Sequence, residues 1–268
     1  MSKLIFANIH RIKKDIPFWL CVGSMFAIGL FMSIKVTKEL PLDSVFFAYA
    51  VIVGLVSSVF CGLFIGTETG DGAIRNKLIV GHTKQNVYMA NLIACIVAGF
   101  VFCLAFIIPM LAIGTARLGF FTMTAGQFIT LLVTTLALSA AYSSIFTLIS
   151  MLCRNKAIIA VACILCFIAL FLLGAAFNLR LQEPEFLNNY VMTIDGVGEV
   201  QNQPNPDYLT GAKREVFQFF LDFIPGGQSI QFAELTMVHY WQLPVYSLII
   251  SALTTLAGVV LFKRKNVN

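Results

Sequence analysis

The residues best placed to do chemistry lie in one polar segment between two long apolar stretches, residues 66–84. Asp71 and Arg75 are four residues apart in this segment and can pair on one face of a helix. Glu68 directly follows an apolar helix, where the helix dipole disfavours a carboxylate. A cation, Arg75 or Lys77, is therefore expected beside it. These charges predict ion pairing and docking of a protein partner.

The same segment reads as a short helix with marked ends. Asp71 can cap its N-terminus, and Gly81 can close its C-terminus in the left-handed conformation. Ile74 and Leu78 lie one turn apart and form an apolar knob on one face. Thr83 can then cap the next helix. A short, capped helix with an apolar knob and flanking charges suits docking into a groove of another protein.

Enzyme chemistry has no comparable support in the sequence. His10, His82 and His239 lie in three different polar segments, and neither a zinc-protease nor a serine-hydrolase motif occurs. No G-x-x-x-x-G-K-[ST] motif occurs, so no loop can cradle nucleotide phosphates in the P-loop manner. Cys163 and Cys166 form a C-x-x-C pair inside an apolar stretch, where packing is favoured over redox or metal chemistry. We therefore expect no catalytic residue, no metal site and no cofactor bound by this chain.

Long apolar stretches dominate the rest of the chain. Hydrophobic residues make up 59% of the 268 residues and charged residues only 12%, against about a quarter in soluble domains. Six stretches without any Asp, Glu, Lys, Arg or His are long enough to cross a bilayer: Pro17–Ile34, Val45–Ile65, Ala90–Ile113, Ala125–Leu152, Ala157–Phe177 and Leu243–Phe262. This pattern predicts an all-α integral membrane protein with six transmembrane helices in a single domain, residues 1–268.

Charge predicts the orientation of the six spans. If the N-terminus is cytoplasmic, the inner segments carry 12 of the 18 basic residues: Lys3, Arg11, Lys13, Lys14, Arg75, Lys77, Lys84, Arg154, Lys156, Lys263, Arg264 and Lys265. The outer segments then carry Lys35, Lys38, Arg117, Arg180, Lys213 and Arg214. The positive-inside rule therefore places both termini in the cytoplasm. The net charge of +5 reflects this topology, so a nucleic-acid partner is not expected.

Residues Lys3–Ile16 read as an amphipathic helix at the membrane interface. Its predicted apolar stripe is Ile5, Ile9, Ile12 and Ile16, with Asn8, Arg11 and Lys14 elsewhere. Two roles are open for this helix, a simple anchor or an element that transmits motion.

The loop 178–242 is the largest segment outside the predicted spans. Its first half is polar and rich in turn residues, and an apolar run follows at residues 216–224, closed by Pro225-Gly226-Gly227. This run is too short to span and predicts an interfacial or re-entrant helix, or a helix that covers the mouth of a pore. Ser229 can cap a further short helix that continues to Leu235.

Small residues recur at four-residue spacing in two spans. The second span carries Gly54, Ser58, Gly62 and Gly66, and the fourth carries Thr135, Ser139, Ser143 and Thr147. Small residues so placed let helices approach closely in a membrane. They indicate either packing within one chain or an interface with a second copy, or a surface beside a substrate path.

The polar loop resembles a known family. The residues Glu68-x-x-x-Gly72-x-Ile74-Arg75-Asn76-Lys77-Leu78-x-x-Gly81-x-Thr83 are similar to the cytoplasmic-loop signature of ABC-transporter permeases of the type-2 class. The six spans, the amphipathic N-terminal helix, the apolar run before the last span and the basic tail Phe262–Lys265 extend the resemblance over essentially the full length. The outer loop 178–242 is longer than the smallest members of the family need.

The resemblance implies a partner and a site. In that family the short helix after the second span is the coupling helix, which docks on a separate ATP-binding subunit. Carried over, the docking residues would be Glu68, Asp71, Ile74, Arg75, Lys77 and Leu78. The assembly would hold two copies of the ATP-binding subunit, which bind ATP and Mg, and a second permease copy or homologue in the bacterial plasma membrane.

The expected function is that of a permease subunit of an ATP-driven exporter. Spans without charge favour a lipid-like or amphipathic-peptide cargo, and exporters of peptide toxins and bacteriocins occur in the family. Family geometry suggests Ser57, Ser58, Phe60 and Asn178 as cargo-path residues. Two alternatives remain: a secondary transporter, which would need ionisable residues inside the membrane, and a non-transporting assembly or sensor subunit.

Overall fold

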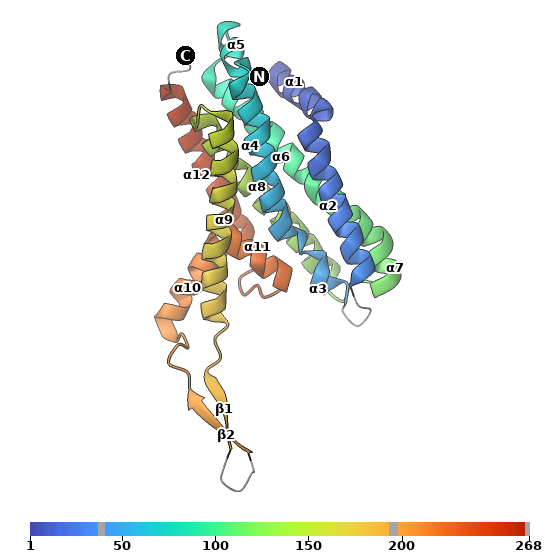
Figure 1. The fold of residues 1–268 in the computed structure, drawn as a ribbon, viewed down its shortest axis with the longest axis vertical. Helices are drawn as coiled ribbons and strands as arrows, with labels where there is room; N and C mark the ends of the chain where they lie inside the picture. The colour runs from blue at the N-terminus through green and yellow to red at the C-terminus, as the bar shows by residue number, and fades with distance from the viewer. Residues whose placement is uncertain (37–40, 193–197, 266–268) are drawn as a thin grey trace.

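The structure is a computed structural model that describes residues 1–36, 41–192 and 198–265. Lys38, one of the basic residues in the charge count, lies outside these ranges. The helices and strands follow in chain order (Figure 1): α1 Ser2–Lys14, α2 Ile16–Lys35, α3 Asp43–Phe46, α4 Tyr49–Gly70, α5 Ala73–Ile79, α6 Lys84–Pro109, the π-helical η1 Met110–Gly114, α7 Thr115–Leu118, α8 Ala125–Leu152, α9 Lys156–Leu181, β1 Phe186–Met192, β2 Gly198–Pro204, α10 Gly211–Phe223, α11 Pro225–Glu234 and α12 Leu243–Arg264.

Six helical segments in the described residues are long and apolar enough to cross a membrane. They coincide with the six charge-free stretches, which confirms the expectation of a multi-pass helical membrane protein. Two of them differ at one end. The second crossing begins with the one-turn helix α3 before α4, and the third continues past Pro109 through η1 and α7. Proline has no N–H to donate, so the regular hydrogen-bond ladder changes where α6 passes into η1.

The helices divide into a central set and a peripheral set. The spans containing α4 and α6 each have 61% of their most apolar window buried within the protein, whereas the windows in α9 and α12 have 22%. α9 and α12 also carry many exposed aliphatic side chains, which the rest of the described chain does not cover. The start of α1, the end of α12 and α5 lie at one end of the bundle, and α3, α7, α10 and the β-hairpin lie toward the other (Figure 1).

The first stripe of small residues lies against α9 of the same chain. A Cβ added at Gly54 would lie 2.6 Å from the Phe167 ring, and one at Gly62 would lie 3.0 Å from the Ala160 backbone. Gly66 faces Lys156 in the same way. The stripe is therefore filled by an intramolecular contact, which leaves no room on it for a second copy.

The second stripe is also internal. The Tyr49 hydroxyl lies 2.5 Å from the Thr135 hydroxyl, and Ser143 Oγ donates to the Cys95 carbonyl at 3.3 Å. Ser139 is buried opposite Gly99, where an added Cβ would lie 2.6 Å from its hydroxyl. Small side chains in α8 thus let α4 and α6 approach it closely.

The buried face of α1 differs from the predicted isoleucine stripe. Leu4, Asn8 and Ile12 are the buried residues of this helix, while Ile16 is 73% exposed and begins α2. The prediction that Asn8 lies away from the apolar face is wrong. Its amide is buried because it has polar partners, which are described below.

The loop 178–242 contains more structure than expected. The antiparallel pair β1–β2 forms a hairpin that projects beyond the helices, so the protein is not purely α-helical (Figure 1). The apolar run lies in α10, as predicted, but Pro225-Gly226-Gly227 opens α11 at its first turn. Ser229 is therefore inside α11, where its hydroxyl donates to the Gly226 carbonyl at 2.7 Å, and the prediction that it caps a helix is wrong.

Glycines allow α11 to press onto α9. A Cβ at Gly226 would lie 2.0 Å from the Leu170 carbonyl oxygen, and one at Gly174 would lie 2.3 Å from the Gly227 nitrogen. Both clashes involve backbone atoms, which cannot turn aside as a flexible side chain can. The two backbones are therefore in contact at this crossing.

This contact makes Gly226→Ala strongly destabilising. We expect a loss of about 2–3 kcal/mol or failure to fold, because overpacking against backbone forces the two helices apart. Thermal unfolding of the purified protein in detergent measures the effect. Gly23→Ala is the matched control, since nothing lies within 4 Å of a Cβ there. Equal melting temperatures for the two variants would contradict the described crossing.

Candidate functional site

A buried carboxylate, Glu68, lies in the last turn of α4 at the end of the bundle that carries α5. Its side chain is fully buried, yet two cations reach it. Lys77 of α5 forms an ion pair and hydrogen bond with Oε1, and Arg11 of α1 lies 3.5 Å from Oε2. The expected cationic partner of Glu68 is thus confirmed for Lys77. Sequence reasoning missed Arg11, which lies 57 residues earlier in the chain.

Arg11 is held in place by more than its charge. Its guanidinium donates to the Phe64 carbonyl and lies 4.0 Å from the centre of the Phe64 ring. The hydrogen bond satisfies one donor of the fork, and the ring face attracts the cation. Because both contacts are with α4, the C-terminal half of α1 is fixed to the end of that span.

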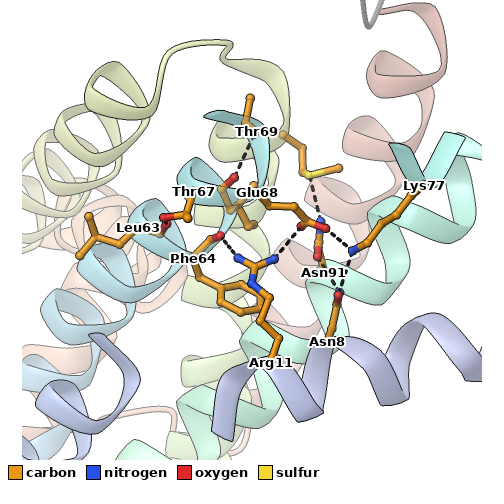
Figure 2. Close-up of polar contacts among 11 residues, drawn as sticks. Asn8, Arg11, Leu63, Phe64, Thr67, Glu68, Thr69, Lys77 and Asn91 are labelled. Carbon is orange, nitrogen blue, oxygen red and sulfur yellow. Dashed lines mark hydrogen bonds and ion pairs between the residues drawn. The ribbon is translucent and has the colours of Figure 1, made fainter. Parts of the chain in front are cut away.

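Amide side chains extend the cluster toward two further helices (Figure 2). Lys77 Nζ donates to Asn8 Oδ1 at 2.9 Å, and Asn8 Nδ2 donates to Asn91 Oδ1 at 2.6 Å. Asn91 Nδ2 contacts Met151 Sδ at 3.5 Å. The Glu68 cluster, defined as Asn8, Arg11, Phe64, Glu68, Lys77, Asn91 and Met151, therefore joins α1, α4, α5, α6 and α8. A buried charge surrounded by oriented donors rigidifies the helices that supply them.

The ends of α5 match the prediction only in part. The helix is preceded by Gly72 in the left-handed region, at φ 70°, and no side chain caps it. Asp71 instead follows the last turn of α4, so the prediction that it caps α5 is wrong, and no ion pair joins it to Arg75. At the other end Gly81 is left-handed at φ 98°, as predicted, and its N–H bonds the Leu78 carbonyl at 3.0 Å while the His82 N–H bonds Lys77 at 3.1 Å. These two bonds are the Schellman closure of a helix.

The apolar knob of α5 faces inward. Ile74 is 5% exposed and Leu78 packs beside it on the hydrophobic core, so they share a face as predicted but are not offered to a partner. The outward side chains are Arg75 and Asn76, and after them Ile79 and Val80, which are 72% and 78% exposed. The exposed surface of α5 is defined here as these four residues. Two adjacent exposed aliphatic side chains at the end of a rigid helix have no partner within the described chain.

The start of α6 and the C-terminal end of α12 are tied together at the same end of the bundle. Thr83 caps α6 as predicted, by accepting from the Asn86 N–H. Lys84 Nζ donates to the Lys263 and Lys265 carbonyls, and Lys265 Nζ donates to Met151 and Cys153 at 2.9 Å each. Burial, together with the nearby Arg154, lowers the pKa of Lys265. The Met151 and Cys153 carbonyls offset part of the cost of burying the charged ammonium, because they satisfy two of its three N–H donors.

The four residues suggested for a cargo path are all in the interior. Ser57, Ser58 and Phe60 are at most 1% exposed, and Asn178 is 6% exposed and donates to Glu234 at 3.1 Å. A single chain therefore holds these side chains in packed protein.

Cys163, the first of the C-x-x-C pair, lies 3.3 Å from the Ser150 hydroxyl, and both cysteines are free. In the described residues no group of three or more His, Cys, Asp or Glu side chains could hold a metal ion.

Comparison with known proteins adds no identification. The sequence matches no protein-family model and no curated protein. Function must therefore be argued from the residues and their geometry.

The Glu68 cluster predicts that neutralising Glu68 lowers the stability of the protein substantially. Glu68→Gln removes the charge that Lys77 and Arg11 share and leaves them close together without an anion, so we expect a loss on the order of 2 kcal/mol. Thermal unfolding in detergent measures it, with the exposed Asp71→Asn as control. A double-mutant cycle with Lys77→Gln should return a coupling energy well above that of an exposed pair. Additive effects would contradict the ion pair.

A second prediction concerns Asp15, between α1 and α2. Burial raises the pKa of Asp15, against opposing contributions from Arg11 and the Phe18 N–H, and one of its carboxylate oxygens is buried without a hydrogen-bond partner. Because the pKa of Asp15 is higher in the folded state, the folded protein favours the protonated carboxyl. The contribution of Asp15 to stability is therefore fully present below the unfolded-state pKa and is lost as the pH rises through the folded-state pKa.

Asp15→Asn should therefore be more stable than the wild type at neutral pH, and its advantage should vanish as pH falls below the carboxyl range. Melting temperatures of the two proteins over a pH series measure the difference. A variant that is less stable at neutral pH would contradict this reading of Asp15.

Proposed function

We propose that the chain is the membrane-spanning permease subunit of an ATP-driven ABC exporter, with ATP and Mg bound by a separate ATP-binding subunit. The resemblance of residues 68–83 to the type-2 permease loop motivates the proposal. The observation that carries it is α5, a short helix that is locked to the bundle on one face and exposes an apolar and basic surface on the other.

The locked face makes α5 suited to pass on a displacement. Lys77 of α5 bonds Glu68 of α4 and Asn8 of α1, so a shift of α5 must move these residues or break a buried ion pair. Breaking such a pair costs several kcal/mol, so the proposal has the paired helices move together with α5. In the proposal, closure of the ATP-binding subunits pushes on the exposed surface of α5, and α1 and α4 follow.

In the proposal, the exposed surface of α5 faces the bacterial cytosol. α5, the start of α1, the end of α12 and the 153–156 connection share one end of the bundle (Figure 1). By sequence, the segments at this end, with Lys84 at the start of α6, carry 12 of the 18 basic residues. That arrangement agrees with the positive-inside rule. ATP-binding subunits need access to cytosolic ATP, so the docking surface has to lie on this side.

The packed interior bears on the cargo path. Ser57, Ser58 and Phe60 are buried within one chain, and the small-residue stripes are filled by helices of the same chain. In the proposal, the path therefore runs between this chain and a second permease copy or homologue. The six spans are free of charged residues over their apolar stretches, which favours an amphipathic peptide or lipid-like cargo over ions or sugars.

The exposed surface of α5 predicts which substitution separates the two subunits. Ile79→Glu should reduce recovery of the ATP-binding subunit with the tagged chain by about tenfold or more, because it places a charge in an apolar contact. Affinity purification from native membranes, with identification of P-loop proteins by mass spectrometry, measures recovery. The matched control is Phe120→Glu, since Phe120 is 83% exposed and precedes α8 at the opposite end. Recovery of no P-loop protein with the wild-type chain would overturn the proposal.

A further inference from the structure

A cavity of about 420 Å³ lies at the end of the bundle away from α5. One wall is a single face of α10, where Glu215, Gln218, Phe219 and Asp222 follow at helical spacing. The opposite wall comes from the connection before α12, with His239, and from Tyr246 in α12 itself. The volume is within the range of small-ligand pockets and exceeds what a lysine side chain or an ethanolamine group needs.

The deepest charge in the cavity is Asp222, whose side chain is 2% exposed. Its carboxylate accepts from Gln218 Nε2 at 2.7 Å and Gln231 Nε2 at 3.1 Å, both neutral amides. The third contact, at 3.0 Å, is His239 Nδ1, whose charge depends on pH. No lysine or arginine pairs with Asp222 among the described residues. A carboxylate buried without a permanent cation is unusual, since burial costs several kcal/mol unless a counter-charge is supplied.

Arg214 also lines the cavity, and Nη1 of its guanidinium is buried without a hydrogen-bond partner among the described residues. It donates to the Leu181 carbonyl at 3.2 Å and lies 5.5 Å from the centre of the Tyr208 ring. The cavity wall therefore carries two carboxylates, Asp222 and Glu215, against the single guanidinium of Arg214, besides the imidazole of His239. This excess of negative charge favours a cationic ligand over an anionic one.

Aromatic rings complete the wall beside these carboxylates. The rings of Phe219 and Tyr246 meet edge to face with centres 5.8 Å apart. Aromatic faces next to carboxylates are how proteins recognise ammonium groups, because the ring quadrupole and the negative charge both attract a cation. The geometry points to a binding site for an organic ammonium group, with Asp222 and Glu215 as anions and Phe219 and Tyr246 as the aromatic wall. This inference is independent of the ATP-driven transport proposed above.

His239 makes the site sensitive to pH. The charged and titratable groups around it are Asp222, Glu215, Arg214 and Tyr246. A protonated imidazole at 3.0 Å supplies to Asp222 the same positive charge that an ammonium ligand would bring. The two compete, so ligand binding should weaken when His239 becomes protonated.

The test uses the purified full-length chain in phosphatidylglycerol nanodiscs, which contain no amine lipid. In a Trp19→Phe background Trp241 is the one remaining tryptophan of the sequence, and it adjoins Gln242 of the cavity wall. Its fluorescence reports titration with N-acetyl-lysine amide, and the uncharged N-acetyl-norleucine amide is the matched ligand control. Phosphoethanolamine forms a second arm, which separates a lipid headgroup from a peptide lysine as the source of the amine.

We expect saturable binding of the lysine compound and none of the norleucine compound. Asp222→Asn should weaken binding about tenfold and Glu215→Gln about threefold, through loss of charge-assisted contacts. Glu185→Gln, an exposed carboxylate at the same end, should leave it unchanged. His239→Gln should keep binding but remove its loss at acidic pH.

Equal binding of the two amides would overturn the inference, as would Asp222→Asn and Glu215→Gln titrating like Glu185→Gln. If Asp222→Asn does not fold, Glu215→Gln and Tyr246→Leu take its place. Weaker binding of the lysine compound by both variants would support the inference, and unchanged binding by both would overturn it. Competition by phosphoethanolamine would support a lipid amine as the ligand, and its absence would support a peptide amine.

Discussion

The ion pairing of one buried carboxylate organises the end of the bundle that carries α5. Glu68 has no exposed side-chain surface, so its charge has to be met from within the protein. Lys77 and Arg11 meet it from two different helices, and neither could be placed there unless α1 and α5 packed against α4. Burying a charge is expensive unless it is paired and hydrogen-bonded. The fold at this end is therefore tied to a specific arrangement of three helices.

This constraint explains why α5 presents one defined face. Ile74, Lys77 and Leu78 are on its inner side, and the exposed surface of α5 is on the other. Gly72 and Gly81, both left-handed, turn the chain sharply at each end of the helix. A seven-residue helix would not be stable alone in water. Its rigidity comes from the Glu68 cluster and from the buried Ile74, which together make it a firm platform for a partner.

The two ends of the bundle use buried acids in different ways. Glu68 has two cations of fixed charge, whereas Asp222 has neutral amides and a histidine. The first arrangement supplies a permanent counter-charge, and the second lacks one among the described residues. The contrast agrees with the mechanical role proposed for the Glu68 cluster and the ligand-binding role proposed for the cavity beside Asp222.

Much of this architecture follows from local sequence signals. The six spans can be predicted because their sequences contain no charged residue. The ion pair of Lys77 with Glu68, the helix end at Gly81 and the helix cap at Thr83 were predicted because each joins residues close together in the sequence. Arg11 was missed because its partner is 57 residues away and helical spacing carries no information about such pairs. Asn8 did carry a signal, since it sits four residues from both Leu4 and Ile12, which are buried. A polar residue within an apolar stripe indicates a polar partner.

Other features could not be derived from pattern. The α5 sequence has apolar residues on two sides, Ile74 and Leu78 on one, Ile79 and Val80 on the other. Spacing alone cannot tell which side packs inward. The hairpin β1–β2 was missed because its strands are rich in Asn and Gln and lack the alternation of a half-buried strand. Asp71 looked like a helix cap, but α4 continues to Gly70 and uses that position to end.

Site-specific cross-linking tests the central claim most directly. A photo-reactive amino acid at position 79 of the full-length chain, irradiated in native membranes, should link to a protein that contains a P-loop motif. The same amino acid at position 120 should not. Cross-linking from position 79 to lipid alone or to a protein without a P-loop, or labelling of position 79 by a membrane-impermeant reagent from outside the cell, would contradict the account.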